Sequence, residues 1–137
     1  MDRIFLHPQA QAFLFENFRA LRLIFNDVLG HLEVDYISIA LINPKHELVY
    51  LSSQPSIEQN LIEHHLWHDD LNLLFAEPSH NAVIWNDIYK KDVLNRLRHY
   101  KLEKPKLKFV LSKPIILKDC RLIYSYGVKT DDPFIHI

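Results

Sequence analysis

The chain has 137 residues, of which 48% are hydrophobic and 12% aromatic. That length fits a single domain over residues 1–137, with a core large enough to be stable without covalent cross-links. Cys120 is the one cysteine, which excludes an intrachain disulfide, and sixteen basic against seventeen acidic residues exclude the strong positive field of a nucleic-acid-binding domain.

Other classes are disfavoured by features that the sequence lacks. The first residues do not join a basic segment to an apolar one, and apolar runs reach about four residues, far below the ~20 that a membrane helix needs. We therefore expect a soluble, cytoplasmic protein that makes no membrane contact. Two glycines, Gly30 and Gly127, are too few for a phosphate-binding loop or a nucleophile elbow. We expect no cofactor and no enzymatic activity.

Residues 8–29 are predicted to form a long helix. Apolar side chains recur at spacings of three and four, among them Phe13, Phe18 and Phe25. Gly30 follows the last apolar positions, as is typical of a helix end. The apolar face is wide enough to contact both a sheet and a second chain, so we expect a homodimer.

Residues 34–52 are predicted to form a β-hairpin. Val34, Tyr36, Ile37 and Ile39 are β-formers in partial alternation, and the sequence from Asn43 to His46 has proline at the second position of a turn. Residues 48–52 supply the second strand.

The remaining chain is predicted to contain two helices and three strands. A short helix is expected over 55–67 and a longer one from Asn86 or Asp87 to about 100, followed by strands at 107–111, 115–117 and 122–128. Strands joined by hairpins form an antiparallel sheet. The predicted fold class is therefore α+β, an α/β sandwich with an antiparallel PAS/GAF-like sheet flanked by helices.

The segment from Val34 to Asp70 resembles the first half of the ligand-binding domain of LuxR-type regulators. In that family a hairpin ends in a small-polar-proline sequence, here residues 52–55, before a helix and an aspartate. A tryptophan follows about fifteen residues later, which matches Asp70 and Trp85. The stretch 107–128 resembles the later hairpin of the family. This partial and divergent resemblance implies a sensor domain that takes part in transcription regulation and quorum sensing.

Several positions depart from the pattern of that family. Where its acyl-homoserine lactone readers carry Trp and Tyr on the helix before the aspartate, this chain has Ile57 and Leu61, and Leu71 replaces the usual proline. The resemblance therefore implies a signal other than the usual one. Nine residues follow Val128, too few for a helix-turn-helix domain. We expect either a sensor domain that stands alone or a fragment of a longer regulator.

Tyr36, Trp67, Asp70 and Trp85 are the predicted ligand-binding residues. Aromatic walls with one buried acid suit a small amphipathic ligand that carries an N–H donor. In the alternative interpretation, Trp85 anchors the core and Asp70 caps the segment that follows it.

His64 and His68 are a candidate metal pair. On a helix they would lie one turn apart on one face, with Glu63 or Asp69 as an oxygen ligand. A zinc site needs three or four convergent ligands, and histidines at a helix end are more often solvated.

Basic residues are concentrated between 90 and 108, interleaved with apolar ones. They are Lys90, Lys91, Arg96, Arg98, Lys101, Lys104, Lys106 and Lys108. This pattern favours an amphipathic helix with a solvated charged face over a phosphate-binding surface.

The leading functional hypothesis is a non-enzymatic, dimeric domain that senses a small molecule. The alternatives are a structural protein-interaction domain with a filled pocket, and a small metal-dependent enzyme that uses His64 and His68.

Overall fold

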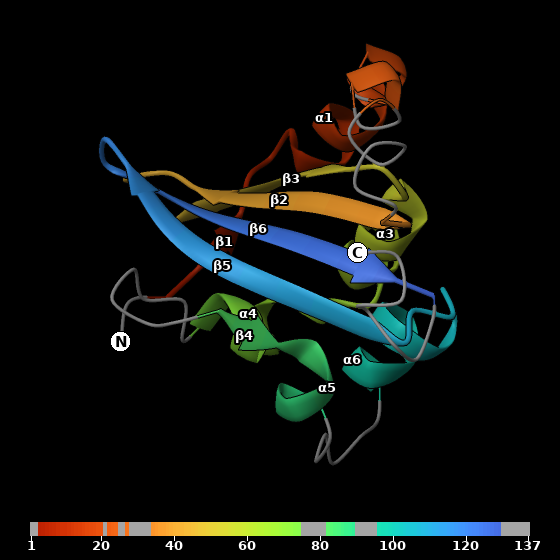
Figure 1. The fold of residues 1–137 in the computed structure, drawn as a ribbon. Helices are drawn as coiled ribbons and strands as arrows, with labels where there is room; N and C mark the ends of the chain where they lie inside the picture. The colour runs from red at the N-terminus through yellow and green to blue at the C-terminus, as the bar shows by residue number, and fades with distance from the viewer. Residues whose placement is uncertain are drawn as a thin grey trace.

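A computed structural model describes residues 3–20, 22–24, 27, 34–74, 82–89 and 96–129 of the chain. Its centre is one sheet with the strand order β1-β3-β2-β6-β5-β4. Helices α3 to α6 gather along one side of this sheet, and α1 lies beside β3 (Figure 1). No helix in these ranges is long and apolar enough to cross a membrane.

The described elements follow one another in this order: β1 (Phe5–Leu6), α1 (Ala10–Glu16), β2 (Tyr36–Ile42), β3 (Glu47–Ser52), α3 (Pro55–Glu63), η1 (Trp67–Asp69), α4 (Leu71–Leu74), β4 (Val83–Ile84), α5 (Trp85–Ile88), α6 (Arg96–Arg98), η2 (His99–Glu103), β5 (Phe109–Leu117) and β6 (Cys120–Val128).

The predicted hairpin at 34–52 is confirmed as β2 and β3, which pair in antiparallel register. Asn43 fixes the turn between them, because its Oδ1 accepts hydrogen bonds from the backbone N–H groups of Lys45 and Glu47, each at 2.9 Å. Asparagine favours turns because its side chain can accept these local backbone hydrogen bonds, and for this reason the turn could be predicted from the sequence.

The α+β class is confirmed, but the sheet is mixed rather than purely antiparallel. Strand β1 pairs with β3 in parallel, with Phe5 opposite Glu47 and Leu6 opposite Leu48. All other pairings are antiparallel. Strand β1 has only two residues and is followed by α1 rather than by a turn and a second strand. The sequence therefore contains no hairpin pattern that predicts it. The chain adds it to the open edge of β3 through long-range backbone bonds.

Two strands were predicted where the structure has one. Strand β5 continues through Pro114, which lies opposite Ile123 of β6. A proline is tolerated because β4 pairs only with Leu111 and Ser112, so the other side of β5 has no described strand partner at Pro114.

The helical predictions hold only in part. Helix α1 ends at Glu16, where Asn17 takes the C-cap position; helical backbone returns at 18–20 and 22–24, and Phe25 lies outside the described residues. The helix expected from 86 to 100 is also interrupted: α5 starts at Trp85 after an Ile84 N-cap, and residues 90–95 lie outside the described ranges.

Candidate functional site

Four buried serines form a row across the side of the sheet that faces the core. Ser38 of β2 lies between Ser52 of β3 and Ser125 of β6. Ser125 in turn lies opposite Ser112 of β5. Each is at most 5% exposed. We call Ser52, Ser38, Ser125 and Ser112 the serine row. Small polar side chains here leave room for larger polar side chains to pack onto the sheet.

Asp70 is the centre of a buried polar cluster above this row. Its Oδ2 accepts a hydrogen bond from Lys101 Nζ at 2.6 Å, and its Oδ1 accepts one from the Tyr89 hydroxyl. Lys101 Nζ also donates to the Tyr89 hydroxyl, which closes a three-membered network. Asp70 is 1% exposed and Lys101 3%. The three side chains therefore hydrogen-bond one another inside the core.

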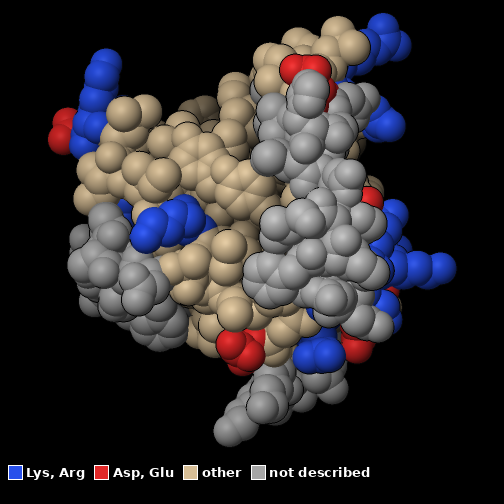
Figure 2. Space-filling model, viewed as in Figure 1, with Lys and Arg blue, Asp and Glu red and all other residues tan. Residues whose placement is uncertain are grey.

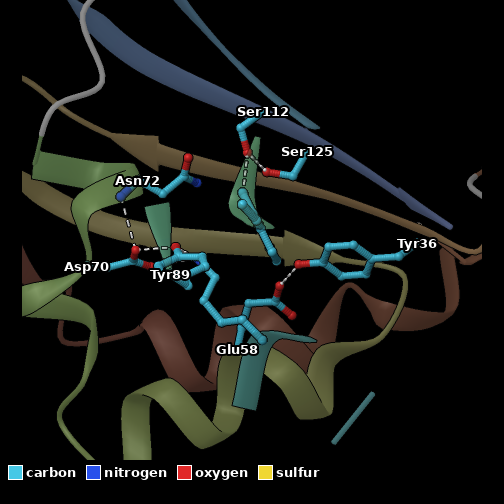
Figure 3. Close-up of polar contacts among 9 residues, drawn as sticks. Tyr36, Glu58, Asp70, Asn72, Tyr89, Ser112 and Ser125 are labelled. Carbon is cyan, nitrogen blue, oxygen red and sulfur yellow. Dashed lines mark hydrogen bonds and ion pairs between the residues drawn. The ribbon is translucent and has the colours of Figure 1, made fainter. Parts of the chain in front are cut away.

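Asp70 also caps the helix that follows it. Its Oδ1 accepts a hydrogen bond from the Asn72 backbone N–H at 3.1 Å, at the start of α4 (Figure 3). The two interpretations of Asp70 as a cap and as a buried pocket acid are thus compatible, because Oδ1 accepts the bonds from both Asn72 and Tyr89 while Oδ2 accepts the bond from Lys101.

A second acid lies beside the first cluster. The Tyr36 hydroxyl of β2 donates a hydrogen bond to Glu58 of α3, and the two side chains point toward each other (Figure 3). Burial raises the pKa of Glu58 to about 7, while the hydroxyls of Ser52 and Tyr36 act against that shift. Among described residues, Glu58 Oε1 and the Tyr50 hydroxyl have no hydrogen-bond partner.

The ammonium group of Lys101 is enclosed by aromatic rings. Its Nζ lies 4.0 Å from the ring centroid of Trp85 and 4.6 Å from that of Tyr89. The Trp85 indole is held in turn by a 2.7 Å hydrogen bond from its Nε1 to Ser112 in the serine row. Burial lowers the pKa of Lys101, and the carboxylates of Asp70 and Glu58 oppose this shift.

These groups surround a small cavity of about 10 Å³. Its lining includes three predicted ligand residues, Tyr36, Asp70 and Trp85, so the structure brings them together. Trp67 is not in the lining; it packs against the edge of the core. A volume near 10 Å³ is about the space for one water molecule.

The structure removes the geometry on which the metal hypothesis depended. Helix α3 ends at Glu63, His64 is its C-cap, and His65 adopts a left-handed φ of 54°. His64 and His68 therefore do not share a helical face. His64 stacks on Tyr100, whereas His68 pairs with Asp69. Within the described ranges, no group of three or more His, Cys, Asp or Glu side chains could hold a metal ion.

Sequence reasoning missed Glu58, Tyr89 and Lys101. Lys101 was placed on a solvated basic face, which is wrong, because it is among the most buried polar residues. Its neighbours Lys104 and Lys106 are exposed as expected. No local signal separates Lys101 from these two lysines, because the exposed Lys106 is also followed directly by a leucine, Leu107.

Comparison with solved structures places this fold in a known class. No protein-family model and no curated protein sequence matches the chain. The fold is instead similar to that of solved LuxR-type regulators, and the predicted resemblance is confirmed at the level of the fold.

Three structures of the protein SdiA are among the solved structures that the chain resembles. The structure of SdiA in complex with octanoyl-rac-glycerol superposes with a TM-score of 0.64 at 14% identity, over 83% of this chain and 48% of that one. A crystal structure of Escherichia coli SdiA gives 0.51 at 12% identity, over 89% and 56%. The solution structure of residues 1–171 of Escherichia coli SdiA gives 0.57 at 12% identity, over 89% and 77%. The chain spans about half of the length of the first two SdiA chains.

Proposed function

We propose that this chain is a non-enzymatic regulatory domain that binds a small molecule at the cavity lined by Tyr36, Asp70 and Trp85. The observation that carries the proposal is the polar interior: two acids, a lysine and the serine row are buried together in the core of a small domain. The LuxR-type sensor fold agrees with this function.

Such an interior is costly for a domain that needs only a stable core. Replacing a buried ion pair with apolar residues of similar volume is often neutral or stabilising by about 1–4 kcal/mol. Each buried polar atom without a partner costs a further 1–3 kcal/mol or so. Glu58 Oε1 and the Tyr50 hydroxyl are two such atoms among described residues. Their position around one cavity favours a binding site over a structural core.

The site differs from a pocket that holds a lipid-like ligand. Pockets for drug-sized ligands are about 300–1,000 Å³, whereas this cavity is about 10 Å³. The octanoyl-rac-glycerol found in SdiA would not fit unless the core opened. With Asp70 and Glu58 in the lining, the site favours a ligand that presents a positive charge or hydrogen-bond donors.

A thermal-shift screen on the full chain tests the proposal. Primary alkylammonium salts, neutral amides and octanoylglycerol would be titrated, and a ligand at 100 times its Kd should stabilise the fold by about 2.7 kcal/mol. We expect at least one class to raise the melting temperature of the chain.

The matched controls are Asp70→Asn and Asp69→Asn. Asp70 is buried in the cluster, whereas the adjacent Asp69 side chain is 74% exposed. The shift should disappear in the first variant and persist in the second. If no class shifts the melting temperature, the binding function is wrong.

We propose further that the domain acts as a homodimer through the segment after α1. Leu23 is 76% exposed and Ile24 59%, which is unusual for large apolar side chains in helical segments. Phe18 is half-buried, with the Arg22 guanidinium 5.4 Å from its ring centroid.

The second candidate function is a protein-interaction domain with a filled interior. The small volume of the cavity favours it, as do the exposed apolar side chains Ile116 and Leu117 at the end of β5. On the face shown in Figure 2, uncharged residues occupy most of the described surface, and most Lys and Arg side chains lie at its edges. The ligand screen separates this candidate from the first.

A further inference from the structure

Lys101 lines the small cavity together with Asp70 and Trp85. Its Nζ is 2.6 Å from Asp70 Oδ2 and 4.0 Å from the Trp85 ring centroid, and it donates to the Tyr89 hydroxyl. An acid with two aromatic rings around a cation is the arrangement by which proteins bind ammonium ligands. Here the ammonium belongs to the chain itself.

The backbone around Lys101 is adapted to this placement. Lys101 lies in the π-helical turn η2, and the Lys104 N–H donates to the His99 carbonyl, five residues back, at 2.8 Å. Such turns are rare and occur frequently at functional sites. Within this turn Lys101 and Leu102 are buried, while His99 and Glu103 are exposed. The turn therefore carries a lysine into the core and keeps its other polar residues in solvent.

We propose that Lys101 is the resident occupant of this site, and that the site accepts the head group of an external primary ammonium compound when Lys101 is displaced. The proposal rests on the binding function proposed for this cavity. It adds that the ligand is a primary ammonium compound and that the Lys101 side chain competes with it. It explains why the remaining cavity is so small: the space is filled by the Lys101 side chain.

The charges around the cavity support an ammonium ligand. Among the described lining residues, Asp70 and Glu58 are acids and Lys101 is the single base. Displacement of Lys101 leaves two acids and several hydroxyl groups around an enlarged space lined by Trp85. A cation is stabilised there, and an anion is disfavoured by the acidic lining.

The variant Lys101→Ala provides a direct test in the full chain. It removes the four atoms from Cγ to Nζ, which are those of n-propylamine, so n-propylammonium chloride is the probe. We expect the melting temperature of the variant to fall below that of the wild type. At tenfold excess over its Kd, the probe should raise the melting temperature of the variant by about 5 °C.

Three comparisons make the result specific. Lys104→Ala removes an exposed lysine of the same segment and should show no response to n-propylammonium. Lys101→Ala/Asp70→Asn lacks the acid and should also show none. The wild type should respond at least tenfold more weakly than Lys101→Ala, because its own side chain competes. Tetramethylammonium, which has no N–H donor, should stabilise Lys101→Ala less than the primary amine does.

A measurement on the wild type covers the case in which Lys101→Ala does not fold. Reductive methylation followed by mass spectrometry reports which lysines are accessible. We expect Lys101 to react at least a hundredfold more slowly than Lys104 and Lys106. Equal reaction rates would show that Lys101 does not reside in the site, and would overturn the proposal.

The failures of the two proposals are distinguishable. In one outcome, some ligand stabilises the wild type through Asp70 while n-propylammonium fails to stabilise Lys101→Ala. In that case the proposed binding function is retained, and the proposal that Lys101 occupies an ammonium site is rejected. If neither protein is stabilised by any compound tested, both proposals fall, and the polar cluster is part of the structural core.

Discussion

Single residues in this core have properties that their sequence neighbours do not share. Asp69 and Asp70 are adjacent acids, yet the first is exposed and the second is 1% exposed with three hydrogen-bonding partners. Lys101 and Lys104 differ in the same way. The difference comes from the side chains that each meets in space, and it determines which of them can take part in binding.

Glu58 should make the stability of the domain depend on pH. Its pKa is raised to about 7 in the folded state from 4.5, so the folded state holds a proton that the unfolded state releases. The stability from this group is therefore fully present below about pH 4.5 and is lost as the pH rises to about 7. The shift corresponds to about 3 kcal/mol at most.

The variant Glu58→Gln isolates this effect, because it resembles the protonated side chain at every pH. Urea unfolding at pH 5 and pH 8 should show the variant gaining stability relative to the wild type as the pH rises. All other side chains are the same in both proteins, so their contributions cancel in the difference. Parallel stability curves for the two proteins would mean that the Glu58 pKa is close to 4.5 in the folded state.

At the scale of elements, the two hairpins bring the serine row together. Antiparallel pairing of β3, β2, β6 and β5 aligns one serine from each strand, although Ser38 and Ser125 are far apart in sequence. Tight packing beside this row holds the Tyr36 ring against β6. Gly127 lies opposite Tyr36, and a Cβ there would be 3.3 Å from Tyr36 Cδ2 and 3.0 Å from Val110 Cγ2.

Gly127→Ala should therefore destabilise the sheet. Val110 and Tyr36 are each 0% exposed, so neither can move aside freely. We expect a loss of about 1–3 kcal/mol in the free energy of unfolding, measured with urea, since overpacking costs that much. The double variant Gly127→Ala/Val110→Ala should lose less than the sum of the single losses. Additive losses would show that the Val110 contact is not the cause.

At the scale of the whole molecule, the helices on one side of the sheet enclose the polar cluster, and the segment after α1 leaves apolar side chains exposed. Leu23 and Ile24 are the clearest cases. A domain with this distribution is expected to cover those side chains with a second copy, which would bury them at a homodimer interface.

Phe18→Glu tests this assembly by placing a charge in the same segment. Light scattering coupled to size exclusion should show a dimer for the wild type at micromolar concentration and a monomer for the variant. Gln11→Glu adds the same charge at an exposed position on α1 and should stay dimeric. A monomeric wild type would rule out the proposed dimer.

The sequence by itself determined the local elements with strong periodicity. The hairpin at 34–52 followed from alternation and from Asn43 and Pro44 in the turn, because such signals act between near neighbours. The resemblance also brought Asp70 and Trp85 into the predicted pocket, and both line the cavity. The α+β class followed from the order of these elements.

Only the tertiary structure decided what fills the site. Lys101 binds Asp70 across 31 positions of sequence, and Tyr36 binds Glu58 across 22. No local pattern distinguishes Lys101 from the exposed lysines beside it, because burial of a charge depends on a partner supplied by a distant element. The parallel strand β1 escaped prediction for the same reason, since its two residues are held by backbone bonds to β3.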